Sequence, residues 1–199
     1  MTPSPGRPRR ASQELLQEAA FELFQLRGYR ATSVEQIAKT AGFSRATFFN
    51  FFSSKAELFW VETDGLIASL RTFLEQCFET DGDGVPPTLH EALLAHAETL
   101  NSASIPWALQ HYRLLEAADD LIASGASRVL GLNRLFLDYL ERRDAGFAAG
   151  EDGAAGRSAD AAVATALLLS ALRAWIDAGV ERRDLRGHLA RACAAAAPR

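Results

Sequence analysis

Three amphipathic helix patterns lie within residues 15–59 with only short turns between them, and this spacing limits the chain to a small set of helical folds. The first pattern follows Ser12, a favourable N-cap residue, and repeats apolar residues at i, i+3, i+4 and i+7 until Gly28. Turns this short do not suit an antiparallel helix pair, but they do suit helices that cross steeply. The sequence therefore predicts a helix-turn-helix reader of duplex DNA at this end of the chain.

The second and third patterns have clear start and stop signals. Ser33 begins the second, with Gln36 three residues later, which is the spacing of a capping box, and Gly42 ends this short helix. Ser44 begins the third pattern. Its first turn carries small and hydrogen-bonding side chains, which a helix needs at the end that enters the major groove.

A fourth helix is predicted to start at once, at Ser54, and to run to near Glu79. Ser54 and Glu57 again have capping-box spacing. The exposed amides of this helix start, together with Lys55, are suited to hold a DNA phosphate. Such a contact positions a protein on DNA without reading the base sequence.

The segment ELFQLRGYRATSVEQIAKTAGFSRATFFNFFSSKAEL resembles the N-terminal domain of TetR-family transcriptional regulators, with RGY-x-x-TSV-x-x-IA, AG-x-S-x-x-T and F-x-SK-x-x-L in order and without a gap. The resemblance covers residues 12–59. It implies an all-α homodimer with two recognition helices on a pseudo-palindromic operator of double-stranded DNA, and release of the DNA when a small molecule binds a C-terminal domain. Phe49 stands where many members have a phosphate-binding Tyr, and Ala46 stands where Gly is usual, so the operator cannot be inferred from a relative.

The predicted DNA contacts divide into base readers and phosphate contacts. Arg45 and Thr47 are the candidates for base contact, and Phe49 is expected at a thymine methyl group or a sugar. The remaining polar residues are expected mainly on phosphates. The predicted DNA-binding residues are Arg9, Arg10, Ser33, Ser44, Arg45, Ala46, Thr47, Phe49, Asn50 and Lys55.

Charge is divided unevenly along the chain. Residues 1–57 contain eight Lys and Arg against five Asp and Glu, whereas residues 58–199 contain thirteen against twenty, so the basic end is the expected DNA end. Residues 1–11 form a basic leader with Pro and Gly, which is expected to be non-helical and flexible. Its arginines either follow the DNA into a minor groove or only solubilise the terminus, and both readings stay open.

Residues 60–199 are predicted to form a helical effector-binding and dimerisation domain, for about nine helices in the whole chain. Thr88 and Glu91 have capping-box spacing, and residues 144–158, rich in Gly and Ala, are expected to form a mobile loop. The expected helices span residues 88–103, 106–117, 119–143, 158–179 and 184–196.

Aromatic and polar residues on these helices are expected to surround one interior that binds an apolar or amphipathic small molecule. The alternative is that they are ordinary core residues. The predicted pocket residues are His96, Leu100, Trp107, His111, Asn133, Phe136 and Trp175. A weaker resemblance of TFFNFFSSKAELFW to regulators associated with mycofactocin systems implies a fatty acyl or acyl-CoA effector.

The last two expected helices are rich in Ala and Leu, which allows close helix packing between two copies of the chain. The alternative is that they only complete the core of one copy. The predicted dimer-interface residues are Leu167, Ala171, Ala174, Leu185 and Leu189.

Several function classes are not expected. The sequence shows none of the short catalytic or nucleotide-binding motifs, so an enzyme is not expected, and neither is a cofactor. Cys77 and Cys193 lie far apart without a Cys/His cluster, so no metal site is expected. The leader lacks the apolar segment of a signal peptide, and a cytoplasmic protein without a membrane partner is predicted. The rival function is a protein-binding or architectural helix-turn-helix module that has no effector.

Overall fold

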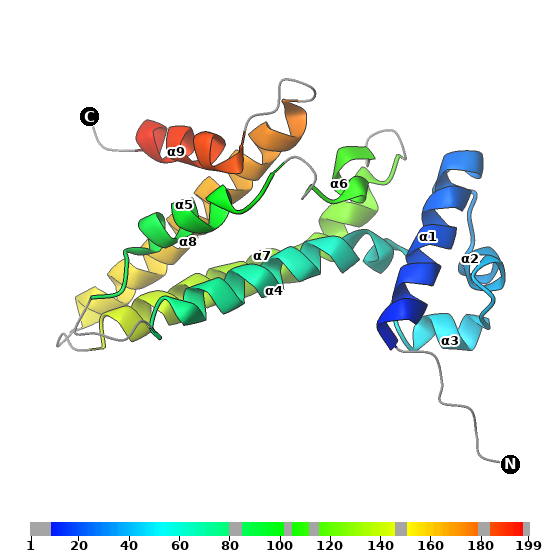
Figure 1. Cartoon of the computed structure of the whole chain (residues 1–199), viewed down its shortest axis with the longest axis horizontal. Coiled ribbons are helices and arrows are strands. Elements are labelled where there is room, and N and C mark those ends of the chain that lie inside the picture. The colour runs from blue at the N-terminus through cyan, green and yellow to red at the C-terminus, as the bar shows by residue number, and fades with distance from the viewer. Residues whose placement is uncertain are drawn as a thin grey trace, which may run out of the picture. The chain divides into compact units, whose positions relative to one another are not determined.

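The structure, a computed structural model, describes residues 9–79, 85–101, 105–111, 116–145, 151–178 and 184–196, and every regular element in these ranges is helical. The all-α fold predicted from the sequence is confirmed (Figure 1). The elements are α1 (Arg9–Arg27), α2 (Val34–Thr40), α3 (Arg45–Phe49), the 3-10 helix η1 (Lys55–Trp60), α4 (Val61–Gln76), α5 (Leu89–Glu98), α6 (Trp107–His111), α7 (Ala118–Arg143), α8 (Glu151–Asp177) and α9 (Leu185–Ala196).

The helices belong to two compact units. The first comprises Met1–Thr63 and Trp107–Gly125, and the second comprises Asp64–Pro106 and Ala126–Arg199. Helices α4 and α7 each contribute residues to both units. The division at residue 60 into a DNA-binding domain and an effector-binding and dimerisation domain stays a prediction. The structure adds α6 and the start of α7 to the N-terminal unit.

Local signals in the sequence set the ends of the short helices in the first unit. The Ser33 side chain accepts a hydrogen bond from the Gln36 backbone N–H, and the Gln36 side chain accepts one from the Ser33 N–H, so the predicted capping box is present. Gly28 and Gly42 have φ values of 84° and 77°, a left-handed conformation that glycine adopts without a steric penalty. These stops let α1, α2 and α3 change direction within a few residues (Figure 1).

Aromatic residues form the core of the first unit. Phe59 is fully buried, and its ring centroid lies 5.6 Å from that of Phe24 and 5.2 Å from that of Tyr29. Phe48 is fully buried as well and anchors α3. The 3-10 helix therefore contributes Phe59 to the same core as Phe24 of α1 and Phe48 of α3.

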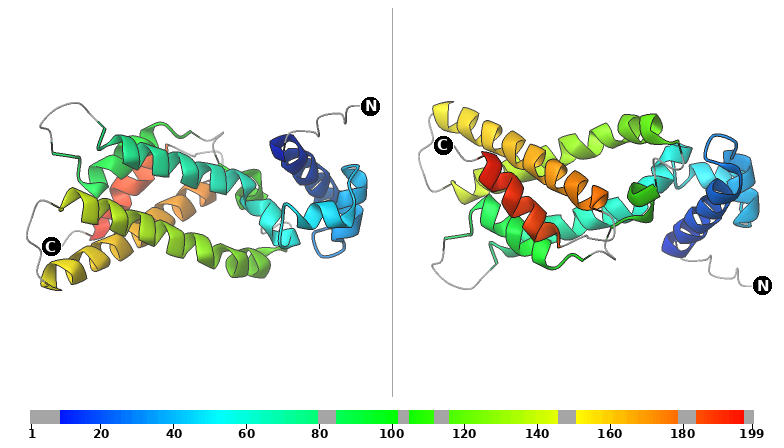
Figure 2. Two further views of the ribbon diagram at one scale, coloured as in Figure 1. Left: turned by 90° about the horizontal axis from the view of Figure 1, so that it is seen from below. Right: turned by 90° about the horizontal axis from the view of Figure 1, so that it is seen from above.

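The second unit has its own core, in which α8 packs against α9 and α9 packs against α5 (Figure 2). Phe136 on α7 and Trp175 on α8 are its largest fully buried side chains. The Tyr139 hydroxyl donates a hydrogen bond to the Pro87 carbonyl oxygen at 2.6 Å. This bond fixes the segment that precedes α5, where the predicted Thr88–Glu91 capping box is present.

Helices α4 and α7 are joined by an ion pair in the second unit. Arg128 on α7 donates from Nε and Nη2 to the two carboxylate oxygens of Asp64 on α4, both at 2.7 Å. A two-point contact of this kind fixes the orientation of both side chains. The views in Figure 2 show the two helices running alongside each other.

Several predicted boundaries were wrong. Residues 55–60 form a 3-10 helix rather than the first turn of a long α-helix, and Ser54 makes no side-chain cap hydrogen bond. The predicted capping box at Ser54 is therefore absent, and its spacing alone was a false signal. The helix expected over residues 88–103 ends at Glu98.

Two expected irregular segments are partly helical. Residues 9–11 belong to α1, so the prediction of a non-helical leader is wrong for them, and Ser12 lies inside the helix instead of capping it. Residues 151–158 belong to α8 although they contain two glycines, because the long apolar stretch that follows carries the helix. The rest of the predicted leader and loop, residues 1–8 and 146–150, lies outside the described residues.

Candidate DNA-binding surface

The N-terminal turn of α3 is fixed by its own cap. The Ser44 hydroxyl accepts a hydrogen bond from the Thr47 backbone N–H at 3.0 Å, and the Ser44 and Thr47 hydroxyls share a second one of 2.8 Å. Phe48 holds the other side of the helix in the core. The cap and the anchor together leave Ser44, Arg45 and Ala46 exposed, and Thr47 half-buried.

Arg45 and Phe49 form a pair on the exposed side of α3. The Arg45 guanidinium carbon lies 4.9 Å above the centre of the Phe49 ring, which is 42% exposed. The Phe48 ring supports Phe49 from below in an edge contact, with centroids 5.4 Å apart. A cation held over an aromatic ring loses part of its rotamer freedom before it binds anything. Arg45 is thus presented in a restricted set of positions.

Lys55 contacts the connection between α1 and α2. Its ammonium donates to the carbonyl oxygens of Tyr29 at 2.6 Å and Thr32 at 2.9 Å, and lies 3.9 Å from the centre of the Tyr29 ring. Burial lowers the pKa of this ammonium. The structure thus gives Lys55 a role inside the unit, and its contact with phosphate stays a prediction.

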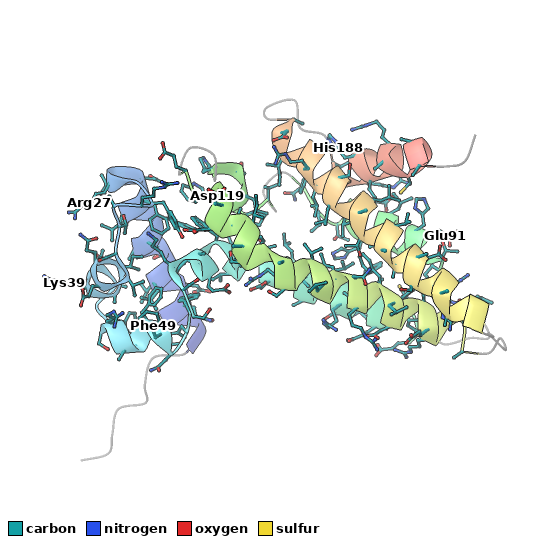
Figure 3. All side chains as sticks on the ribbon, turned by 180° about the vertical axis from the view of Figure 1, so that it is seen from behind. Arg27, Lys39, Phe49, Glu91, Asp119 and His188 are labelled. Atoms are coloured by element: carbon teal, nitrogen blue, oxygen red, sulfur yellow. The ribbon has the colours of Figure 1, made fainter. Side chains whose placement is uncertain are left out.

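The other predicted DNA-binding residues occupy different parts of the first unit. Ser33 and Asn50 are exposed at the N-cap of α2 and the C-cap of α3. The side chains of Arg9 and Arg10 lie outside the described residues. Sequence reasoning omitted Lys39, an exposed basic residue at the end of α2. Figure 3 places it at the outer edge of this unit. The excess of basic residues before position 57 was the signal that could have found it.

The structure divides the predicted ligand-pocket residues between the two units. In the second unit, Phe136 and Trp175 are fully buried, and His96 is buried with its ring centroid 5.2 Å from that of Phe73 on α4. Burial lowers the pKa of His96, so the neutral imidazole is favoured. Leu100 packs against the same core, and Asn133 on α7 is half-buried.

Trp107 and His111 belong to the first unit instead. The Trp107 ring lies 4.6 Å from Phe21 on α1 and stacks on His111 at 4.5 Å. Trp107 also lines a shallow groove of about 250 Å³ with four residues of α1. The expectation that all seven residues surround one interior is therefore not met within either unit.

Three of the five predicted dimer-interface residues face the core of the single chain. Ala171, Leu185 and Leu189 are at most 2% exposed in a single chain, so they form its core instead of a surface for a partner. Leu167 is half-buried, and Ala174 is exposed. An almost uniformly apolar helix gives no periodicity that would separate its core face from its outer face.

Around Ala166, the outer face of α8 carries apolar and small side chains. Val163 is 53% exposed and Leu169 is 36% exposed, with exposed Ala166 and Ser170 beside them. Residues 153–177 are long and apolar enough to cross a membrane, with 28% of that window buried, although a core helix of a soluble protein passes the same test. In the single chain this face is exposed to solvent.

Cys77 and Cys193 are half-buried thiols that form no disulfide, and burial raises the pKa of both. Within the described ranges, no three His, Cys, Asp or Glu side chains are grouped so that they could hold a metal ion.

Known proteins similar to this chain were found by sequence and by fold, and they are described as transcriptional regulators. The family model described as "Bacterial regulatory proteins, tetR family" matches residues 16–60. A protein of Mycobacterium tuberculosis (strain ATCC 25618 / H37Rv), named as a candidate mycofactocin biosynthesis transcriptional regulator, MftR, is 26% identical over 144 residues, which are 71% of this chain and 70% of that protein. The crystal structure of Thermus thermophilus FadR, a TetR-family transcriptional repressor in complex with lauroyl-CoA, is 24% identical, covers 92% of this chain and 91% of its own, and superposes with a TM-score of 0.59.

Proposed function

We propose that the chain is a member of the TetR family of bacterial transcriptional regulators and acts as a cytoplasmic repressor that leaves its operator when a small molecule binds. The observation that carries the proposal is the exposed first turn of α3, where Arg45 is held over Phe49 beside a fixed Ser44–Thr47 cap. Side chains of this kind at the start of a short, anchored helix suit hydrogen bonds to base edges in the major groove. Arg45 and Thr47 read bases, and the exposed Ser33 and Asn50 contact phosphates.

Two copies of the chain bind one operator. We assign the dimer interface to the outer face of α8 around Ala166, since it is apolar, exposed and rich in small side chains that allow close helix packing. A second copy would cover this face. The two α3 helices would then lie about one turn of DNA apart, roughly 34 to 36 Å.

Arg45→Ala tests base reading by α3. We expect discrimination at one operator position to fall by about 1 to 3 kcal/mol, because a guanidinium in the major groove makes paired hydrogen bonds to guanine that alanine cannot replace. The measurement is competition of single-base operator variants for the purified protein, together with the dependence of affinity on salt.

Lys39→Ala is the matched control, since it removes one positive charge from another exposed residue of the first unit. It should lower the salt slope and weaken binding to all sequences alike. If Arg45→Ala behaved in the same way, with discrimination kept at every position, Arg45 would be a phosphate contact only.

We propose a fatty acyl or acyl-CoA effector that binds within the second unit near His96, Leu100, Asn133, Phe136 and Trp175. Supporting this class are the apolar, aromatic core and the lauroyl-CoA of the FadR structure, whose fold this chain shares. His96 contacts Phe73 on α4, the helix that continues from η1. An effector that favours one position of Phe73 thus biases the helix that leads to the DNA-binding unit.

The effector proposal predicts that lauroyl-CoA raises the unfolding temperature and releases bound DNA. Ligand at about 100 times its dissociation constant stabilises the folded state by roughly 2.7 kcal/mol. Free coenzyme A, which lacks the acyl chain, is the control and should have little effect. An acyl-CoA series that neither stabilised the protein nor released DNA would favour a helix-turn-helix module without an effector.

A further inference from the structure

The first two turns of α7 belong to the first unit, where Leu121 packs into the core, although they follow α3 by more than fifty residues in the sequence. The buried Tyr29, just after α1, donates a hydrogen bond from its hydroxyl to the Asp120 carboxylate. The same carboxylate interacts electrostatically with Lys55, whose ammonium donates to the Tyr29 carbonyl oxygen at 2.6 Å. Asp120 therefore interacts with both Tyr29 and Lys55, which also contact each other.

A second contact lies one turn further along α7. The Trp60 indole N–H donates to the Ser124 hydroxyl at 2.7 Å, and Ser124 donates in turn to the Asp120 carbonyl oxygen at 2.7 Å. A side chain at Gly125 would begin 2.9 Å from the Trp60 ring, closer than atoms pack, so glycine is required for this approach. Trp60 is the last residue of η1, and α4 follows it directly.

These contacts hold the two segments that flank α2 and α3. Tyr29 lies in the connection before α2, and Lys55 and Trp60 lie in η1 after α3. A short helix of five residues such as α3 has little stability of its own, so its direction depends on the segments at its two ends.

We propose that Asp120 and Ser124 on α7 are positioning residues for DNA recognition: they hold Tyr29, Lys55 and Trp60, and thereby set the orientation of α2 and α3. The inference rests on the proposed DNA-binding function. It gives α7, in addition to α4, a role in positioning the DNA-binding helices. Helix α7 continues into the second unit, as α4 does, so two helices run from the first unit into the second.

Asp120→Ala tests this inference, with Asp119→Ala as its matched control. Both residues are exposed acids in the first turn of α7, and Figure 3 labels Asp119 there. Charge alone predicts that either variant binds the DNA polyanion slightly better. We expect Asp120→Ala instead to bind the operator about fivefold more weakly, because it loses a hydrogen bond to a charged acceptor, while binding to unrelated duplex stays unchanged. Tyr29→Phe should reproduce the loss, and the double variant should be no worse than either alone.

Hydrogen exchange provides a readout that does not depend on DNA. Asp120→Ala should speed amide exchange in the connection between α1 and α2, residues 28–33, and Asp119→Ala should leave it as in the wild type. Equal operator affinity and equal exchange in the two variants would overturn the positioning role. If the wild type preferred no DNA sequence, the proposed function would fail, and the exchange comparison would still decide whether Asp120 positions this connection.

Discussion

Ala166→Arg is expected to convert a dimer into monomers and to weaken operator binding by at least about 100-fold. Ala166 is exposed on the outer face of α8, beside Val163 and Ser170, where we place the partner. An arginine there adds bulk and an unpaired charge to a closely packed apolar interface, a change that costs on the order of 3 to 5 kcal/mol. Sedimentation measured over a range of concentrations would give the dimer dissociation constant, and a DNA titration would give the affinity.

Folding of the single chain should be unaffected, because Ala166 lies outside its core. Ala68→Arg is the control, since Ala68 is an exposed alanine on a different helix, α4. It should leave both dimerisation and DNA binding intact. If the Ala166→Arg protein remained dimeric, the interface could not lie on the outer face of α8, and this assignment would be wrong.

Phe59→Ala is expected to lower the free energy of unfolding of the first unit by about 3 to 5 kcal/mol. Phe59 is fully buried, and its ring lies beside those of Phe21, Phe24 and Tyr29, so its removal leaves a cavity among rings that cannot easily close it. Denaturant unfolding followed by circular dichroism measures the change. Because the second unit has a separate core, we expect its transition to be retained while the first unit unfolds at lower denaturant.

Phe49→Ala removes the same number of atoms from the same unit and is the control. Phe49 is 42% exposed, so the substitution leaves no buried cavity and should cost less than about 1 kcal/mol. Comparable losses for the two variants would contradict the assignment of Phe59 to the core of this unit.

Much of the fold could be predicted because its signals are local. Each of these signals acts between residues only a few positions apart. The structure confirms the two predicted capping boxes, Ser33–Gln36 and Thr88–Glu91, and the predicted helix stops at Gly28 and Gly42. Ser54 shows the limit of such reasoning. Its spacing to Glu57 is the same, but the chain forms a 3-10 helix there and the side-chain cap is absent.

The contacts that could not be predicted join residues far apart in the sequence. In the sequence, Asp120 is an ordinary acidic residue at the start of a helix, and only the structure shows its interaction with Tyr29. Trp107 and His111 fit an aromatic pocket lining by composition, yet they pack beside α1. On α8, Ala171 and Ala166 have the same side chain, and only the packing of the second unit's core shows that Ala171 is the buried one.

Selection of genomic DNA fragments by the purified protein, read by sequencing at near-physiological salt, tests the central claim most directly. A sequence-specific dimeric regulator predicts enrichment of one pseudo-palindromic motif, with half-sites about 10 base pairs apart from centre to centre. The motif should weaken at one position with Arg45→Ala and disappear with Ala166→Arg. Binding that depends only on salt, with no enriched motif for the wild-type protein, would contradict the account.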